Sequence, residues 1–257
     1  MIGEVRRVAL ETGATTTVEC WGEAGPAVLC VHGIGSSRRD FARLGEALAS
    51  THRVFAYDQR GHGESTGGDG RMALELLAAD LRAVADSIGT VTVVVGHSWG
   101  GAVALIGGPK VARALVLIDP MLRVPPDSFE RDYVESLALL LFNEGAARER
   151  DVRAAFAEAH ALDREGKVHA MQSLSLATIR RLGSDNGVDS GGWDLRERLE
   201  RLKIPTTILL AGEDSVVAPE DVVALAPPVR LEHVAEHGHA LHRSAFERFV
   251  SAVAAAS

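Results

Sequence analysis

Residues 93–101 place a serine where its hydroxyl could act as a nucleophile. In this run, Gly96-His97-Ser98-Trp99-Gly100 follows an apolar, strand-like stretch and precedes a helical one. A serine on such a strand-to-helix turn has strained backbone geometry, and its hydroxyl projects clear of the sheet. The flanking glycines leave room where side chains would collide with a neighbouring strand or helix. We therefore predict that Ser98 is a catalytic nucleophile.

A serine hydroxyl also needs a general base, a group that orients the base, and donors for the oxyanion. His239 follows a predicted strand and precedes a helix, and Asp214 follows another strand in the run 208–214. The order Ser98, Asp214, His239 is the one expected for this type of turn. We predict that His239 is the base and Asp214 the acid. His237 remains an alternative base, and Asp119, which also ends a strand, an alternative acid.

The loop after the first buried strand is suited to stabilising negative charge. His32-Gly33-Ile34-Gly35 follows the apolar run 27–31, and its glycines allow the backbone to approach the serine. We expect the backbone N–H groups of Ile34 and Trp99 to form an oxyanion hole. Neither role depends on a side chain.

The elements that must position these residues alternate between strands and helices. Short runs of four to eight apolar residues are typical of strands buried on both faces of a parallel sheet. The pattern predicts strands over 5–10, 15–21, 27–31, 54–57, 91–95, 114–118, 204–210 and 229–234. Between residues 127 and 203 only helical patterns occur, over about 128–143, 146–165, 167–182 and 194–202. The sequence therefore predicts an α/β domain with a helical insertion.

Composition excludes several classes of function. The chain of 257 residues carries 27 Lys and Arg against 35 Asp and Glu, a formal charge of −8, which argues against a phosphate-backbone binder. Its two cysteines cannot form a disulfide framework. We find neither an apolar secretory start nor a run of about 18 apolar residues, so we expect a cytoplasmic protein that binds no membrane.

Taken together, these motifs resemble the α/β-hydrolase superfamily, in its serine-nucleophile, carboxylesterase-like branch with a helical cap. The resemblance rests on the runs 32–35, 58–65, 96–101, 210–214 and 238–239, which occur in family order. It implies a mostly parallel eight-stranded sheet with one antiparallel edge and helices on both faces. Residues 1–120 and 204–257 would form the core, and 121–203 the cap. It also implies the roles assigned above to Ser98, Asp214 and His239.

The predicted function is that of a serine hydrolase acting on a small or medium carboxylic ester, or a related acyl compound, through an acyl-enzyme on Ser98. Its partners would be the small-molecule acyl substrate and water. The chemistry requires no metal or organic cofactor. Carbon–carbon bond hydrolase, lactonase, thioesterase and cofactor-free perhydrolase activities remain alternatives, as does a non-catalytic small-molecule receptor.

Other residues carry more local expectations. Trp99, Met121 and Trp193 are the residues we expect to bind substrate. His97 should point into the structure, His32 should hydrogen-bond within its own loop, and Asp58 should pair with Arg60. A metal site among the histidines at 233, 237, 239 and 242 is disfavoured, because they cross from strand to loop to helix.

Overall fold

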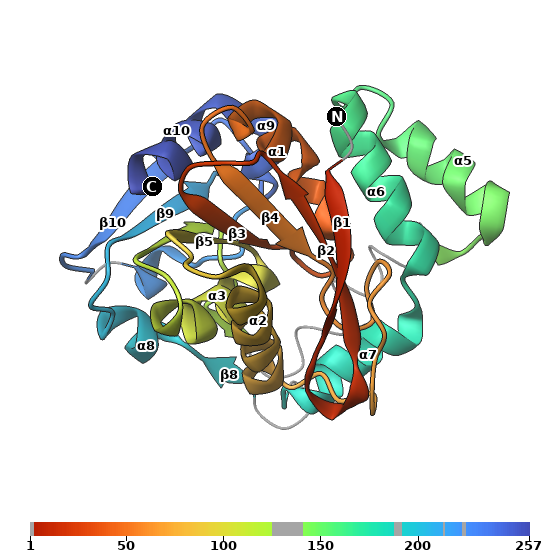
Figure 1. The fold of residues 1–257 in the computed structure, drawn as a ribbon, viewed down its shortest axis with the longest axis horizontal. Coiled ribbons are helices and arrows are strands. Elements are labelled where there is room, and N and C mark those ends of the chain that lie inside the picture. The colour runs from red at the N-terminus through yellow and green to blue at the C-terminus, as the bar shows by residue number, and fades with distance from the viewer. Residues whose placement is uncertain (1–2, 125–140, 188–191, 213, 223–224) are drawn as a thin grey trace.

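A single eight-stranded sheet forms the centre of the molecule (Figure 1). The computed structural model describes residues 3–124, 141–187, 192–212, 214–222 and 225–257. The strands lie in the order β1-β2-β4-β3-β5-β6-β9-β10. They comprise β1 (Glu4–Ala9), β2 (Thr15–Trp21), β3 (Ala27–Val31), β4 (Arg53–Tyr57), β5 (Val93–His97), β6 (Ala114–Ile118), β9 (Thr206–Ala211) and β10 (Val229–Val234).

The strand directions agree with the prediction of a mostly parallel sheet. From β4 through β10 every neighbouring pair is parallel. Strand β2 is antiparallel to both β1 and β4, so the reversed strand lies second from the edge. Because the carboxyl ends of parallel strands lie along one side of the sheet, the loops after β3, β5, β6, β9 and β10 come together there.

Helices cover both faces of the sheet, and the strands are apolar on both sides for that reason. In β3, Ala27, Leu29 and Val31 pack into one core cluster, whereas Val28 and Cys30 pack into the other. The first cluster contains α2 (Leu74–Ile88) and α3 (Trp99–Gly107). The second contains α1 (Ala42–Leu48), α9 (Leu241–Ser244) and α10 (Phe246–Ala256), as the two layers of Figure 1 show.

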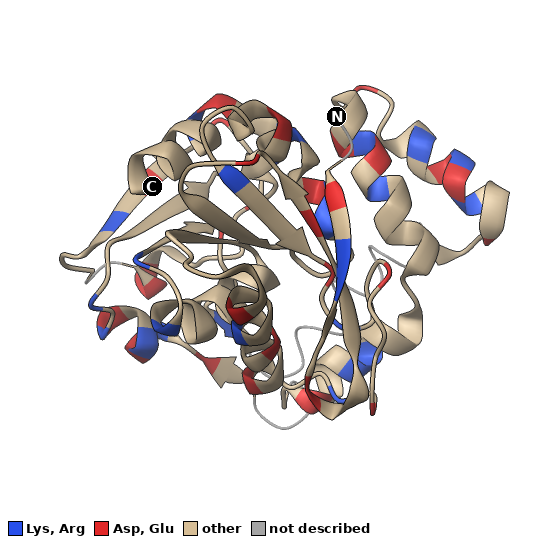
Figure 2. Cartoon of the chain, in the orientation of Figure 1, with Lys and Arg blue, Asp and Glu red and all other residues tan. Residues whose placement is uncertain are grey.

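The chain between β6 and β9 is mainly helical. Its described helices are α5 (Gly145–Ala155), α6 (Ala161–Ser173), α7 (Leu176–Asp185) and α8 (Arg196–Glu200). The helix expected over 128–143 falls largely outside the described residues, and the one expected over 146–165 is divided into α5 and the start of α6. Along α5 and α6 both signs of charge are interspersed (Figure 2).

One short strand pair in this segment was not predicted. Strand β7 (Arg123–Val124) pairs antiparallel with β8 (Trp193–Asp194). Two residues per strand are too few to produce a recognisable alternation of apolar and polar side chains, so no pattern could indicate them. Among the described residues, no helix combines the length and the apolar character that crossing a membrane requires.

A buried ion pair fixes the loop after β4 to helix α2. The Arg60 guanidinium is fully buried and donates to both carboxylate oxygens of Asp80, with Nη2 2.8 Å from Oδ1. It also donates to the Thr12 hydroxyl and to the carbonyl of Glu11. The predicted pairing of Arg60 with Asp58 is therefore wrong, because Arg60 extends to α2 instead.

We expect Arg60→Met to lower the free energy of unfolding by about 3–5 kcal/mol, because it leaves the Asp80 carboxylate buried without its counter-ion. Burial already raises the pKa of Asp80 against the opposing effect of Arg60. The double variant Arg60→Met/Asp80→Leu should recover much of the loss. Urea denaturation followed by circular dichroism measures both, and a single variant within about 1 kcal/mol of wild type would contradict the expectation.

Candidate active site

Ser98 lies at the turn between β5 and α3, as the sequence predicts. Its backbone has φ 54° and ψ −119°, a conformation that costs energy for a residue with a side chain. Among the described residues only Thr12, Ser98 and Asp119 combine a side chain with a positive φ. Two of these three strained positions are thus candidate site residues at the ends of neighbouring strands. The Ser98 N–H donates to the carbonyl of Ile118 at 3.0 Å and joins the two strand ends.

The strained turn is possible because backbone segments approach one another very closely around it. A Cβ on Gly100 would lie 2.2 Å from the carbonyl oxygen of Val31, and one on Gly96 would lie 2.4 Å from that of Gly100. A Cβ on Gly33 would lie 3.2 Å from the Ser98 Cβ. The loop after β3 is therefore in contact with the serine turn, as expected for a loop that supplies an oxyanion donor.

His239 comes from the loop after β10 and forms a hydrogen bond with Asp119. Its Nδ1 lies 2.6 Å from Oδ2 of Asp119, whose side chain is fully buried, while the imidazole keeps 28% of its surface exposed. A carboxylate on Nδ1 holds the ring in one tautomer and orientation, with Nε2 available for proton transfer. The His239 carbonyl accepts a hydrogen bond from Nε2 of His97 at 3.1 Å, next to Ser98.

The Asp119 carboxylate is held by several donors. Oδ1 accepts from the Ser215 hydroxyl at 2.6 Å and from the Ala211 N–H at 3.1 Å, and Oδ2 accepts from the Val216 N–H at 3.0 Å. Burial by itself would raise the pKa of Asp119, but the hydrogen bonds from His239, Ser215 and Val216 outweigh it and lower the pKa below its usual value. Asp119 is therefore an ionised, fixed partner for the imidazole.

The expected pairing of His239 with Asp214 is wrong in this structure. Asp214 is exposed, and it lies beside Gly238, where a Cβ would be 3.1 Å from its Oδ2. The imidazole instead contacts Asp119, the alternative that the sequence left open. The physical reason is position: Asp119 directly follows β6, next to the strand that carries Ser98, whereas Asp214 lies three residues beyond the end of β9. Glu213, the third carboxylate, lies outside the described residues.

Three histidine rings lie in a row behind the serine turn. The ring of His97 lies 4.7 Å from that of His239 and 4.3 Å from that of His242, centroid to centroid. Burial, reinforced by the two neighbouring histidines, holds the pKa of His97 well below its usual value, so the ring is neutral. As predicted, His97 points into the structure, where it fixes the backbone of His239.

The described residues include one group that could hold a metal ion. Single ligand atoms of Asp40, His97 and His242 lie within 4.8 Å of one another. Asp40, however, already accepts hydrogen bonds from Ser36, His242 and Arg243. Burial would raise the pKa of Asp40, but Arg243 and His242 hold it well below its usual value. The Arg243 guanidinium thus already supplies the positive charge that the carboxylate needs, and a hydrogen-bond network explains the group better than a metal site.

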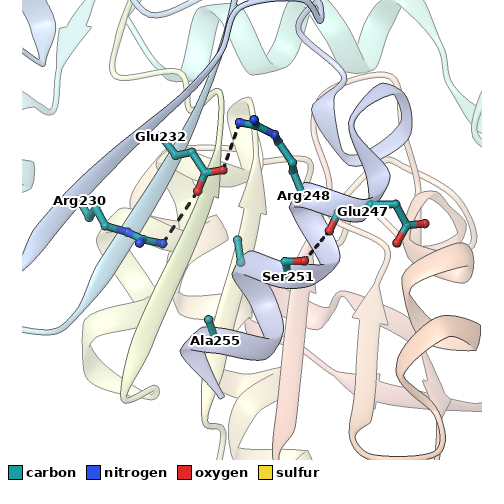
Figure 3. A pocket seen from close by; sticks show the side chains of 7 residues that line it. Arg230, Glu232, Glu247, Arg248, Ser251 and Ala255 are labelled. Atoms are coloured by element: carbon teal, nitrogen blue, oxygen red, sulfur yellow. Dashed lines mark hydrogen bonds and ion pairs between the residues drawn. The ribbon is translucent and has the colours of Figure 1, made fainter.

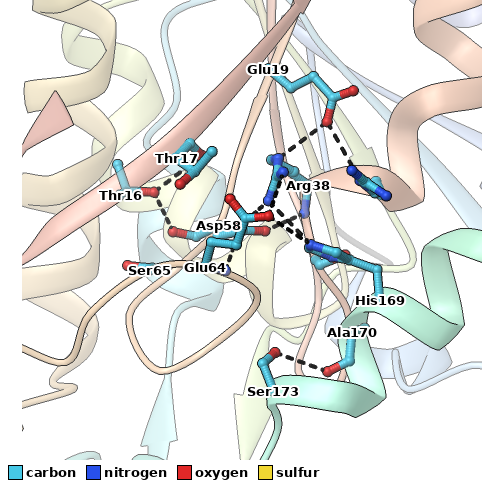
Figure 4. Close-up of polar contacts among 12 residues, drawn as sticks. Thr16, Thr17, Glu19, Arg38, Asp58, Glu64, Ser65, His169, Ala170 and Ser173 are labelled. Carbon is cyan, nitrogen blue, oxygen red and sulfur yellow. Dashed lines mark hydrogen bonds and ion pairs between the residues drawn. The ribbon is translucent and has the colours of Figure 1, made fainter. Parts of the chain in front are cut away.

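A second buried network joins the loops that follow β3 and β4. Arg38, which is 1% exposed, pairs with Asp58 and Glu19 and also reaches Glu64 (Figure 4). This network explains why Asp58 does not pair with Arg60. His32 Nδ1 donates to the carbonyl of Gly33 at 2.7 Å, as predicted, and its Nε2 accepts from the Gln59 N–H at 3.0 Å. Nothing in the sequence pattern had indicated Arg38.

The three predicted substrate-binding residues lie close to the serine. Met121 is buried, and its N–H donates to the carbonyl of Ser98 at 3.0 Å. The rings of Trp99 and Trp193 form an edge-to-face pair with centroids 5.8 Å apart. Their contact with substrate stays a prediction, as do the oxyanion roles of the Ile34 and Trp99 N–H groups.

A separate surface groove lies between β10 and α10 (Figure 3). Its lining residues include Arg230 and Arg248, which pair with Glu232 at 3.9 and 3.5 Å. None of the predicted site residues lines it. Two of its arginines are thus compensated by Glu232.

Comparison with known proteins agrees with this architecture. The model of the alpha/beta hydrolase family matches residues 28–252, and the chain belongs to that family. Among solved structures, the N-formylmaleamic acid deformylase Nfo of Pseudomonas putida superimposes with a TM-score of 0.79 at 25% identity, covering 97% of this chain and 100% of that one.

Curated relatives include enzymes and a much larger protein. The pimeloyl-[acyl-carrier protein] methyl ester esterase of Xanthomonas oryzae is 28% identical over 89% of this chain and 96% of its own length. The polyketide synthase ThaQ of Burkholderia thailandensis is also 28% identical, over 91% of this chain, but the match spans only 12% of ThaQ. The chain thus belongs to the alpha/beta hydrolase family, with an esterase among its relatives.

The two carboxylates can be distinguished by substitution. We expect Asp119→Asn to slow labelling of Ser98 by a fluorophosphonate by about 10³–10⁴-fold, because the imidazole loses the anion that orients it and stabilises its charged form. Asp214→Asn is the matched control and should change the labelling rate by less than about threefold. The reverse ranking would restore Asp214 as the acid. Circular dichroism spectra should show that both variants fold.

Proposed function

We propose that this protein is a serine hydrolase that cleaves a carboxylic ester or a related acyl compound through an acyl-enzyme on Ser98. His239 takes the hydroxyl proton as Ser98 attacks the acyl carbon, and then donates it to the leaving group. Asp119 orients the imidazole and stabilises its charged form. Water, activated by the same base, releases the acyl group.

The observation that carries this proposal is the hydrogen bond from His239 to the buried Asp119, next to a serine in strained backbone geometry. A strained turn is costly and persists only where surrounding contacts enforce it. A buried carboxylate that accepts hydrogen bonds from four donors is likewise not needed for packing alone, because an apolar side chain would fill the same space. Both features are expected of an activated nucleophile, and neither is needed by a receptor that merely encloses a ligand.

The oxyanion formed during attack would be bound by backbone N–H groups. The amide of Trp99, at the first residue of α3, and the amide of Ile34, in the loop that contacts Ser98, are the proposed donors. The segment between β6 and β9, with Trp193 and Met121 at its edges, would act as a cap over the site. Esterases and a deformylase among the similar proteins favour acyl transfer to water as the reaction class.

We expect Ser98→Ala to lower the turnover of p-nitrophenyl esters by at least about 10³-fold, because no other group can form the acyl-enzyme. The fold should be retained, since Ala removes only the hydroxyl. Ser65→Ala, in the loop after β4, is the matched control and should keep turnover within about threefold. Unchanged turnover in Ser98→Ala would refute the proposal.

Two further measurements separate the alternatives. Labelling of wild type by a fluorophosphonate, with loss of labelling in Ser98→Ala, demands an activated serine and excludes a silent receptor. Slow turnover of simple esters beside rapid cleavage of a vinylogous diketone would instead assign the carbon–carbon bond hydrolase activity.

A further inference from the structure

Lys167 in helix α6 contacts the loop that borders the serine turn. Its ammonium donates to the carbonyl of Gly35 at 2.8 Å. Gly35 lies two residues after Gly33, where a Cβ would be 3.2 Å from that of Ser98. Since two residues span at most about 7 Å, these contacts together place the ammonium at most roughly 17 Å from the Ser98 side chain.

The position of Lys167 is fixed by its neighbours on α6. His169 Nδ1 lies 2.9 Å from the Ser37 hydroxyl, and its side chain extends from α6 toward Arg38 (Figure 4). On the other side, a Cβ on Gly166 would lie 2.8 Å from the carbonyl of Arg39. Helix α6 therefore rests directly on residues 35–39, which keeps the backbone of Lys167 within reach of the Gly35 carbonyl.

The charge of Lys167 is not compensated by a nearby carboxylate. Across the described ranges, no Asp or Glu lies within ion-pair distance of its ammonium, although the residue is half-buried. Asp40 is the acidic group whose charge it senses, and that carboxylate is already engaged by Arg243 and His242. The Phe156 ring, whose centroid lies 5.8 Å from Nζ, offers a cation–π contact but no anion. Buried cations are normally paired, so this position is suited to an added anion.

The Lys167 ammonium is charged and has hydrogen-bond donors for an anionic ligand. Burial, reinforced by Arg243, lowers the pKa of Lys167 to about 8, so it is still mostly charged at neutral pH. An ammonium has three N–H donors, and the Gly35 carbonyl takes one. An anion that accepts from the remaining donors would replace the hydrogen bonds to water that burial removes.

We propose that Lys167 binds a carboxylate of the substrate, so that the enzyme prefers acyl compounds whose acyl chain ends in a second acidic group. This inference rests on the proposed serine hydrolase function and names its substrate class. A separation below that bound is compatible with the five-carbon acyl chain of glutarate, counting both carboxyl carbons.

A matched pair of substrates tests the preference. The mono-p-nitrophenyl ester of glutarate and p-nitrophenyl valerate have five-carbon acyl chains and differ mainly in the terminal carboxylate. Wild type should have a kcat/KM at least about tenfold higher for the glutarate ester, because a charge-assisted hydrogen bond away from bulk water contributes that much. Lys167→Met should abolish the preference, Lys167→Arg should retain part of it, and Lys203→Met, at an exposed lysine, should leave it unchanged.

The ratio of the two kcat/KM values separates recognition of the carboxylate from a purely structural effect of Lys167. A role for Lys167 only in holding the Gly35 loop would lower both values equally and leave their ratio unchanged in Lys167→Met. That result would overturn the proposal, as would a wild type that does not prefer the glutarate ester.

The preference should also fall as the pH rises from 7 to 9, because Lys167 loses its proton in passing through about 8. The glutarate carboxylate is ionised throughout this range. Three groups from packed elements face Lys167, namely Arg243, Asp40 and His62. The pKa of Asp40 is held well below its usual value and burial lowers the pKa of His62 to about 3, so neither group changes its charge between pH 7 and 9. A ratio that is constant over this range would contradict the assignment.

Direct binding separates the failure of this inference from failure of the catalytic proposal. Glutarate should bind to Ser98→Ala at least about tenfold more tightly than valerate in isothermal titration calorimetry, and Lys167→Met in that background should remove the difference. If wild type neither hydrolyses esters nor is labelled by the probe, the hydrolase proposal is refuted, but this binding measurement is unaffected. Equal binding of the two acids would refute the carboxylate site.

Discussion

The hydrogen bond between His239 and Asp119 is the constraint on which the site depends. It joins a residue after β10 to one after β6, with β9 between them, and so fixes the loop of the imidazole relative to the strands that carry the serine. A carboxylate can be buried this completely only if its lone pairs are occupied, and here Ala211, Ser215 and Val216 share that task with the histidine. The β9 loop therefore serves the site by solvating the acid.

Close backbone packing at the serine turn fixes the position of Ser98 in a similar way. Gly96 and Gly100 allow β3, β5 and α3 to approach at distances that exclude a Cβ, and at Gly33 a Cβ would be in tight contact with Ser98. Ser98 is thereby held in a conformation it would not otherwise adopt, and its N–H is fixed to Ile118, the residue before Asp119. The proposed nucleophile and acid thus follow two adjacent strands, whereas the imidazole comes from a separate loop.

Much of this could be predicted from the sequence because the signals are local. The buried parallel strands appear as uninterrupted apolar runs, and the turn at Ser98 is marked by its flanking glycines between a strand and a helix. The choice between Asp119 and Asp214 could not be made in this way. Each carboxylate follows a strand, and the distinction depends on which strand lies beside β5 and on how the loop after β9 folds back, both of which are long-range properties.

Contacts between residues far apart in the sequence also explain the other predictions that were wrong or absent. Arg60 and Asp58 are two residues apart in the sequence, which suggests a local ion pair. Arg60 instead pairs with Asp80 in α2, and Asp58 pairs with Arg38 before α1, each across 20 residues of sequence. Lys167 gave no signal at all, because a lone lysine in a helix with charges of both signs is indistinguishable from a solvated one. Its significance appears only when α6 is placed on the Gly35 loop.

The position of the acid has a mechanical consequence for the imidazole loop. If His239 withdraws, Asp119 keeps three hydrogen bonds, and the buried charge is not left without donors. At the carboxylate, withdrawal therefore costs about the strength of one charge-assisted hydrogen bond, rather than the several kcal/mol of an unsolvated buried anion. The backbone of His239 is held separately, by the hydrogen bond from His97 to its carbonyl. The buried carboxylate is therefore stabilised independently of its contact with the imidazole.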